Sequence, residues 1–150
     1  MEPEVEKKYR KAGKIAAEVR EASRSIVVVG KRLLDIAEET ESLIREKGGE
    51  PAFPVNISIN DVAAHYTPTK KEESTIKEND MVKIDVGVHV DGYVGDTAVT
   101  INFNTDLEDL VKAAEMALQE AVKTVRPDAL LSDVSSVIEE TIKGFGFKPV

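Results

Sequence analysis

The chain has 150 residues, of which 41% are hydrophobic and 32% charged, a balance that excludes a disordered polypeptide and suffices for one folded domain. The formal net charge of −8 argues against a broad surface for nucleic acid or anionic membrane, because both would be repelled. Cysteine is absent, which excludes disulfides and thiolate-bound metals. The charged N-terminus lacks a signal-peptide pattern and no apolar run is long enough to span a bilayer, so we expect a cytoplasmic protein.

Two amphipathic helices are predicted at the start of the chain. Apolar residues recur at three- and four-residue spacing over residues 4–28 and again over residues 31–47, where Gly48-Gly49 ends the pattern. Residues 52–104 then change in character. They are rich in Val, Ile and Thr, with Asn, Asp and Pro between them, which predicts strands and turns.

Two further helices are predicted in the last third of the chain. The spacing of Thr105 and Glu108 is that of a capping box, which predicts a helix start at Thr105. An apolar stripe continues from there until Arg126-Pro127 breaks it. The fourth helix is expected at about residues 130–143, ending near Gly144.

The second helical pair repeats the pattern of the first. After a one-residue insertion, the aligned pairs are Ile36 with Val134, Ile44 with Ile142, Gly48 with Gly146, and Pro51 with Pro149. Any two helical hairpins share some of these features, so a duplication and a coincidence both stay open. The first copy continues into a sheet, whereas the second ends where its strands are expected to begin.

A β-hairpin is predicted around Asp91-Gly92, which lies between two alternating runs and is a strong signal for a two-residue turn. The turn predicts the register of the two strands: Val90 with Tyr93, His89 with Val94, Gly87 with Asp96, and Asp85 with Ala98. Ile84, Val86 and Val88 then share the other, apolar face, which we expect to pack under the helices.

Asp85 and Asp96 are expected on one face of this hairpin, as diagonal neighbours about 7–8 Å apart at Cα. Two carboxylates at that range can converge on one or two hard cations, and Gly87, opposite Asp96, leaves space beside it. The alternative is a polar strand face that binds only water. A stable metal site also needs four or more ligands, which His65, His89 or residues elsewhere would have to supply.

Two segments make a family resemblance visible: PAFPVNISINDVAAHYTP, residues 51–68, and IKENDMVKIDVGVHVDGYVGDTAVT, residues 76–100. In this order and spacing they resemble type II methionine aminopeptidase of the archaeal kind, a member of the pita-bread metallopeptidase family. Prolidases and proline aminopeptidases share the two aspartates, but they usually carry an arginine shortly after the second, where this chain has Thr97-Ala98-Val99.

The resemblance implies an α+β pita-bread fold, with two pseudo-symmetric halves around a dinuclear metal site. Residues 1–104 would be the first αβ half and residues 105–150 the helical start of the second half, with the remainder absent. The implied activity is hydrolytic removal of the initiator methionine from nascent proteins in the cytoplasm, a step of protein maturation.

Site residues are implied position by position. Asp85 corresponds to the terminal metal ligand and Asp96 to the bridging one. His65 corresponds to a catalytic histidine that contacts the substrate, and Phe53 to an aromatic residue that lines the methionine pocket. The implied cofactors are two divalent metal ions, such as cobalt, manganese, iron or zinc.

The chain departs from the family pattern because one histidine and two glutamates that complete the metal site have no counterpart in it. We therefore expect the chain alone to be inactive, and we expect a complementary C-terminal chain or a second copy as partner. Two alternatives remain: a metal-free binding module of pita-bread type, and an inactive half-domain that assembles with itself through a bare sheet edge.

Overall fold

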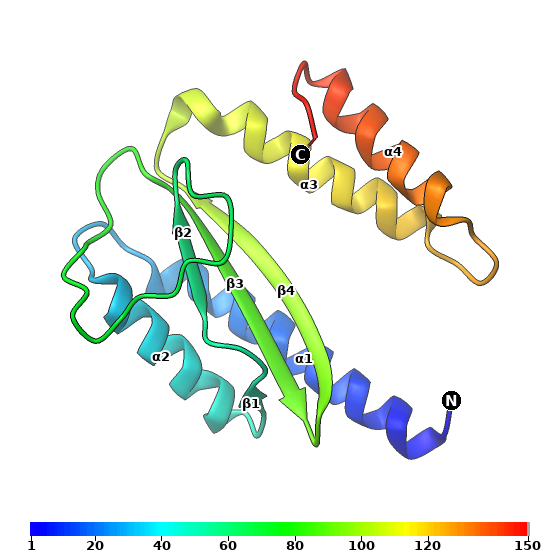
Figure 1. Cartoon of the computed structure of the whole chain (residues 1–150), viewed down its shortest axis with the longest axis horizontal. Helices are drawn as coiled ribbons and strands as arrows, with labels where there is room; N and C mark the ends of the chain where they lie inside the picture. The colour runs from blue at the N-terminus through cyan, green and yellow to red at the C-terminus, as the bar shows by residue number, and fades with distance from the viewer. Residues whose placement is uncertain (150) are drawn as a thin grey trace. The chain divides into compact units, whose positions relative to one another are not determined.

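The structure, a computed structural model, describes residues 1–149. It divides into two compact units, Met1–Phe103 and Asn104–Val150. The first unit is an antiparallel four-stranded sheet with two helices against one face (Figure 1). Its elements are, in chain order, α1 (Pro3–Ile26), α2 (Leu33–Glu46), β1 (Glu50–Pro51), β2 (Asn56–Ile59), β3 (Met81–Val90) and β4 (Tyr93–Asn102).

The long strand β3 organises the sheet. It pairs with β4 along one edge over its whole length, and with β2 and β1 along the other edge. Alternate β3 residues, including Val82, Ile84, Val86 and Val88, are fully buried, because their side chains point toward α1 and α2. Ile15, Val19 and Ile36 are among the helical residues that complete this core.

The predicted hairpin register is confirmed at every pair. Val90 lies opposite Tyr93, Gly87 opposite Asp96, and Asp85 opposite Ala98. The turn residues Asp91 and Gly92 have φ values of 51° and 86°, as a two-residue hairpin turn requires. The register follows from this turn, because shifting a strand by one residue would move Ile84 and its apolar neighbours into water.

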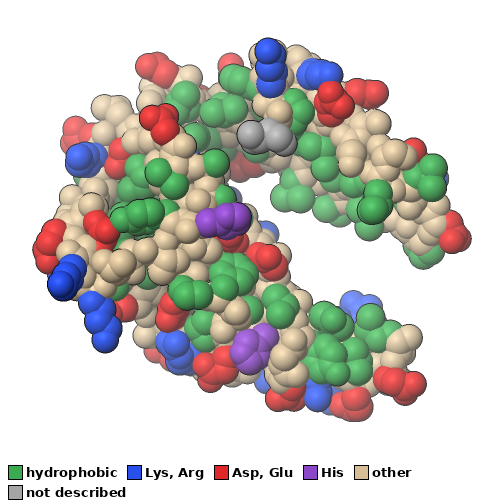
Figure 2. Space-filling model, viewed as in Figure 1, with side chains coloured by type: hydrophobic (Ala, Val, Ile, Leu, Met, Phe, Trp, Pro, Cys, Tyr) green, Lys and Arg blue, Asp and Glu red, His purple; other side chains and the backbone are tan. Residues whose placement is uncertain are grey.

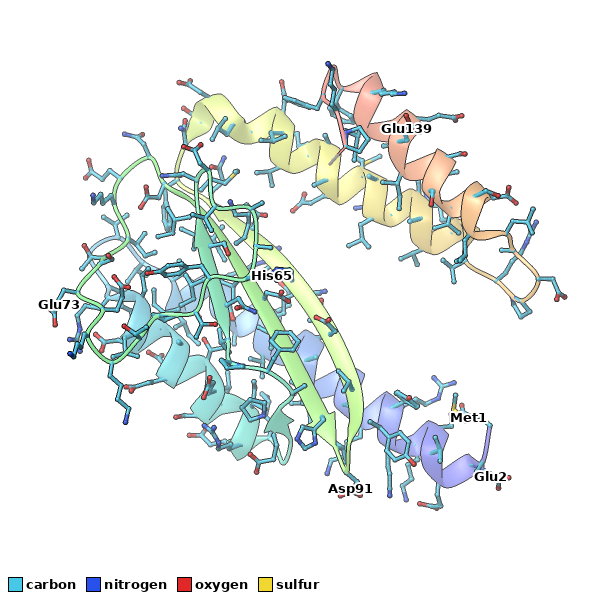
Figure 3. All side chains as sticks on the ribbon, in the orientation of Figure 1. Met1, Glu2, His65, Glu73, Asp91 and Glu139 are labelled. Atoms are coloured by element: carbon cyan, nitrogen blue, oxygen red, sulfur yellow. The ribbon has the colours of Figure 1, made fainter. Side chains whose placement is uncertain are left out.

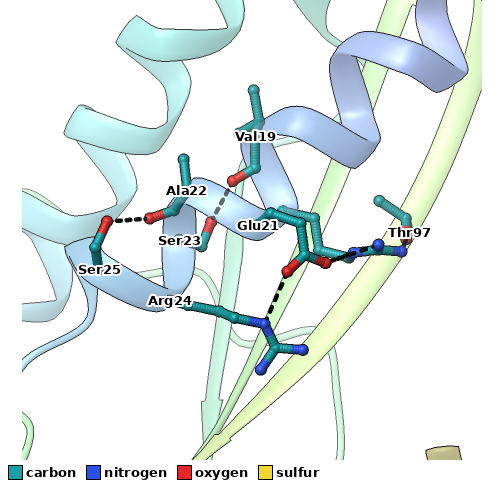
Figure 4. A network of polar contacts seen from close by, with 8 residues as sticks. Val19, Glu21, Ala22, Ser23, Arg24, Ser25 and Thr97 are labelled. Atoms are coloured by element: carbon teal, nitrogen blue, oxygen red, sulfur yellow. Dashed lines mark hydrogen bonds and ion pairs between the residues drawn. The ribbon is translucent and has the colours of Figure 1, made fainter.

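Helix α1 lies close beneath β4, and a glycine makes this approach possible. A Cβ atom on Gly95 would lie 2.7 Å from the backbone nitrogen of Gly13 in α1. Nearby, Arg20 Nη1 donates a hydrogen bond of 3.0 Å to Thr97 Oγ1, while its guanidinium is also held by Glu21 (Figure 4). This contact joins the helix layer to the edge strand of the sheet.

The second unit contains a short 3₁₀ turn, η1 (Thr105–Leu107), and two helices, α3 (Glu108–Thr124) and α4 (Leu131–Gly144). The capping-box prediction at Thr105 is wrong in its capping residue. Asn104 is the N-cap of η1, because its side-chain oxygen accepts a hydrogen bond from the Asp106 N–H.

Contacts between α3 and α4 bury small side chains. The buried residues of α3 are Ala113, Ala117 and Ala121, whereas Leu118 and Val122 are 59% and 66% exposed. Part of the apolar stripe predicted for this helix therefore faces outward. Among residues 1–149, no helix combines the length and apolarity that crossing a membrane requires.

Candidate functional site

The face of the sheet turned away from α1 carries the two aspartates. Asp85 lies in the middle of β3 and is partly buried, while Asp96 lies on β4, opposite Gly87, and is exposed. Burial raises the pKa of Asp85, and the negative charge of Asp96 and a hydrogen bond between the two carboxyl groups raise it further. The two carboxyl groups therefore meet, as the register predicted, and their surroundings disfavour ionisation of Asp85.

His65 lies on the same side of the sheet, on the loop that passes over β2 (Figure 3). Its positive charge lowers the pKa of Asp85, so the imidazole lies within electrostatic reach of the aspartate pair. His65 is exposed and has a φ of 66°, in the left-handed region. A non-glycine residue costs about 1–2 kcal/mol there, so the surrounding loop must hold it in place.

Three hydrogen bonds hold that loop on the free edge of β2. The Ile57 N–H donates to the Tyr66 carbonyl at 2.7 Å, and the Thr67 hydroxyl donates to Asn56 Oδ1 at 2.8 Å. The Tyr66 N–H donates to Ser58 Oγ at 3.4 Å. The residues that directly follow His65 are therefore fixed to the strand beside β3.

Phe53 lies on the aspartate face as well. Its ring covers Gly87 so closely that a Cβ atom there would lie 2.2 Å from the ring. The expectation that Gly87 leaves open space beside Asp96 is therefore corrected, because the Phe53 ring fills this space. The two predicted substrate-binding residues, Phe53 and His65, thus reach the same face as the aspartates from different loops.

His89 does not join the cluster, although both histidines of the chain are visible on this face (Figure 2). Its Nδ1 accepts a hydrogen bond from the Gly92 N–H at 3.3 Å, so the ring belongs to the hairpin turn. Asp91, in the same turn, pairs with Lys8 at 3.1 Å. These two residues therefore support the hairpin end, and His89 is not placed to act as the further metal ligand considered from the sequence.

Sequence reasoning missed two residues next to the pair. Asn56 lies directly opposite Asp85 on β2 and is buried. Lys83 lies on β3 two residues before Asp85, with its side chain on the same face, and burial lowers the pKa of its ammonium group. Lys83 Nζ donates to the Asn60 carbonyl at 2.7 Å. The alternation of Asn56-Ile57-Ser58-Ile59 was the available signal, since it places Asn56 and Ser58 on the polar face.

The site offers a partial set of metal ligands. Carboxylate oxygens suit divalent cations, and Asp85 and Asp96 lie close enough to share one. Within residues 1–149, however, no group of three or more His, Cys, Asp or Glu side chains converges on a common point. The two aspartates fit one side of a metal centre and require further ligands from elsewhere.

Comparison with known proteins identifies the family of the chain. Residues 7–150 match metallopeptidase family M24. The chain belongs to this family. It is 47% identical to a methionine aminopeptidase of Methanocaldococcus jannaschii over 150 residues, which are all of this chain and 51% of that protein. It is 43% identical to a methionine aminopeptidase of Methanothermus fervidus, over 95% of this chain and 83% of that protein.

The solved structure of a methionine aminopeptidase from Thermotoga maritima superimposes with a TM-score of 0.88 at 31% sequence identity, over 99% of this chain and 63% of that one. The predicted α+β pita-bread fold is therefore confirmed. The chain spans about half the length of several curated methionine aminopeptidases. Its similarity to them thus concerns their N-terminal portion.

Proposed function

We propose that this chain carries the first half of the active site of a methionine aminopeptidase, which removes the initiator methionine from nascent proteins in the cytoplasm. The observation that supports this most is the contact between Asp85 and Asp96 on the open face of the sheet, within reach of His65. A metal-free binding module would have no use for two carboxylates that repel each other at this distance.

Each side chain has a role in this proposal. Asp85 and Asp96 hold divalent ions, which when bound supply Lewis acidity toward the peptide carbonyl and lower the pKa of a water. His65 donates a hydrogen bond to the substrate where negative charge develops. Phe53, fixed against Gly87, presents an apolar wall to the methionine side chain.

Two carboxylates bind a divalent ion weakly, so we propose that residues outside this 150-residue sequence supply the remaining ligands. The matching test adds, as a separate chain, the C-terminal portion of the M. jannaschii relative that lies beyond the matched region. With manganese or cobalt, we expect the mixture to release methionine from a peptide whose second residue is small. Each chain alone is expected to be inactive.

Matched variants make this test specific. Asp85→Asn and Asp96→Asn should abolish the restored activity, whereas His89→Asn, which changes a hairpin-turn residue, should keep most of it. A folded, metal-loaded complex of the two chains that released no methionine would contradict the proposed function.

A further inference from the structure

The segment that carries His65 begins at Asn60, directly after β2, and residues 60–65 form an arch over the sheet (Figure 3). Both end residues of this arch have positive φ values, 51° at Asn60 and 66° at His65. Residues other than glycine keep this conformation only where surrounding contacts enforce it. On the far side of His65, the hydrogen bonds of Tyr66 and Thr67 to β2 provide such contacts.

The other end of the arch is held through Asn60, whose four polar atoms are all hydrogen-bonded. Its N–H donates to the Met81 carbonyl and its Oδ1 accepts from the Met81 N–H, both at 2.9 Å. Its Nδ2 donates at 2.9 Å to Oδ1 of Asp80, which is buried. Its carbonyl accepts the hydrogen bond of 2.7 Å from Lys83 Nζ. The start of the arch is therefore tied to the first residues of β3.

Lys83 is the charged member of this arrangement. It lies between Ser58 of β2 and Thr100 of β4, on the same face of the sheet as Asp85, and is half-buried. A lysine on a sheet face ordinarily extends its ammonium group into water. Here Nζ contacts a backbone carbonyl instead, and within residues 1–149 it forms no ion pair. The ordering of this long side chain is therefore directed at the arch.

We propose that Lys83 is a positioning residue, whose ammonium group holds the Asn60 end of the arch and thereby places the His65 imidazole near Asp85. Lys83 and Asp85 are two residues apart on β3, so one strand supports both the histidine and the aspartate. The arch cannot lift from the sheet at Asn60 unless the bond to Lys83 breaks. This assignment rests on the proposed function, in which His65 contacts substrate and Asp85 binds metal.

NMR spectroscopy of the metal-free full chain tests the placement of His65, because the chain has only two histidines. At constant pH, Lys83→Met should move the ring signals of His65 toward those of an unstructured histidine, since the imidazole loses its fixed position. The signals of His89, which belongs to the hairpin turn, should stay unchanged. Lys70→Met, at an exposed position after the arch, is the matched control and should leave both histidines unchanged.

The absence of cysteine allows the ammonium group to be removed and restored at this one position. Lys83→Cys alkylated with 2-bromoethylamine carries an ammonium group at the end of a chain as long as that of lysine. Alkylation with 1-iodopropane gives a neutral chain of the same length. We expect the native His65 signals with the first reagent only. Native signals in the propyl-modified chain, or their absence from the aminoethyl-modified chain, would overturn the inference.

Kinetics of the two-chain enzyme, formed with the C-terminal portion of the M. jannaschii relative, extend the test to catalysis. His65 is assigned a role where negative charge develops, so its displacement by Lys83→Met should lower kcat about tenfold to hundredfold and leave KM nearly unchanged. In a His65→Ala background, Lys83→Met should have little further effect on kcat. An equal loss in both backgrounds would show that Lys83 does not act through His65.

The two proposals fail in different measurements. An inert two-chain enzyme would count against the proposed function, while the NMR spectra would still decide whether Lys83 places His65. An active enzyme in which Lys83→Met changes neither kcat nor the His65 signals would overturn the role of Lys83 alone.

Discussion

The aromatic ring of Phe53 lies against Gly87, at the position that a side chain on residue 87 would occupy. Gly87 itself faces Asp96 across the hairpin. Because Gly87 has no side chain, the Phe53 ring can lie on β3 next to the pair formed by Asp85 and Asp96. The ring and the pair form neighbouring parts of one surface.

Gly87→Ala is expected to destabilise the chain by about 1–3 kcal/mol, because a Cβ atom 2.2 Å from the Phe53 ring forces the ring aside. Urea unfolding measures the loss. In a Phe53→Ala background the same substitution should cost much less, since its partner in the clash is absent. Equal costs in both backgrounds would show that the ring is not the obstacle.

Gly95→Ala and Gly13→Ala should act in opposite directions, although the two glycines are neighbours in space. A Cβ atom on Gly95 would lie 2.7 Å from the backbone of α1. A helix backbone cannot relieve this clash by a rotamer change, so we expect Gly95→Ala to lower the free energy of unfolding by about 2–3 kcal/mol. A Cβ atom on Gly13 meets nothing within 4 Å, so alanine there should stabilise α1 by about 0.5–1 kcal/mol. Thermal unfolding of both variants compares them; a stabilised Gly95→Ala would contradict the close approach.

Thr67→Val should loosen the loop that carries His65. The substitution removes the hydrogen bond to Asn56 and leaves the buried Asn56 Oδ1 without this donor, at a cost of about 1–2 kcal/mol. Hydrogen exchange of the Ile57 amide, which donates to Tyr66, reports the loosening directly. Thr69→Val, at an exposed position of the same loop, is the control and should leave the Ile57 amide protected.

Asp85→Asn should stabilise the metal-free chain at neutral pH. Burial and Asp96 raise the pKa of Asp85 in the folded state above its ordinary value of 3.8. The ionised form is therefore penalised by folding, and this penalty disappears as the pH falls through the raised pKa. We expect a gain of about a few tenths of a kcal/mol at pH 7, because water screens a partly exposed group, and no difference below about pH 4.

Urea unfolding in EDTA at the two pH values measures this difference. A variant less stable than the natural chain at pH 7 would show that the carboxylate of Asp85 stabilises the fold, contrary to the sign derived from its surroundings.

Local signals predicted the part of the site that lies on the hairpin. The Asp91-Gly92 turn and the alternation of Ile84, Val86 and Val88 determine the register, and the register determines that Asp85 and Asp96 share a face. The roles of these aspartates as metal ligands, and those of His65 and Phe53 toward substrate, remain predictions.

Contacts over long sequence separations could not be predicted in this way. Phe53 reaches Gly87 across thirty or so intervening positions of strand and loop. The His65 loop has no periodicity and is positioned by hydrogen bonds to Asn56 and Ser58, which a linear pattern does not reveal. Asn104 and Thr105 are adjacent and both are good capping residues, so the sequence pattern did not show that Asn104 caps η1.

The alanine contact between α3 and α4 bears on how the chain unfolds. Ala113, Ala117 and Ala121 remove little apolar surface from water, and no residue of α4 is fully buried. The helical pair therefore has a small stabilising core compared with the sheet unit. In calorimetry we expect a weak transition of the helical pair well below the main one, and proteases should cleave the chain after Phe103 while the sheet unit is still intact.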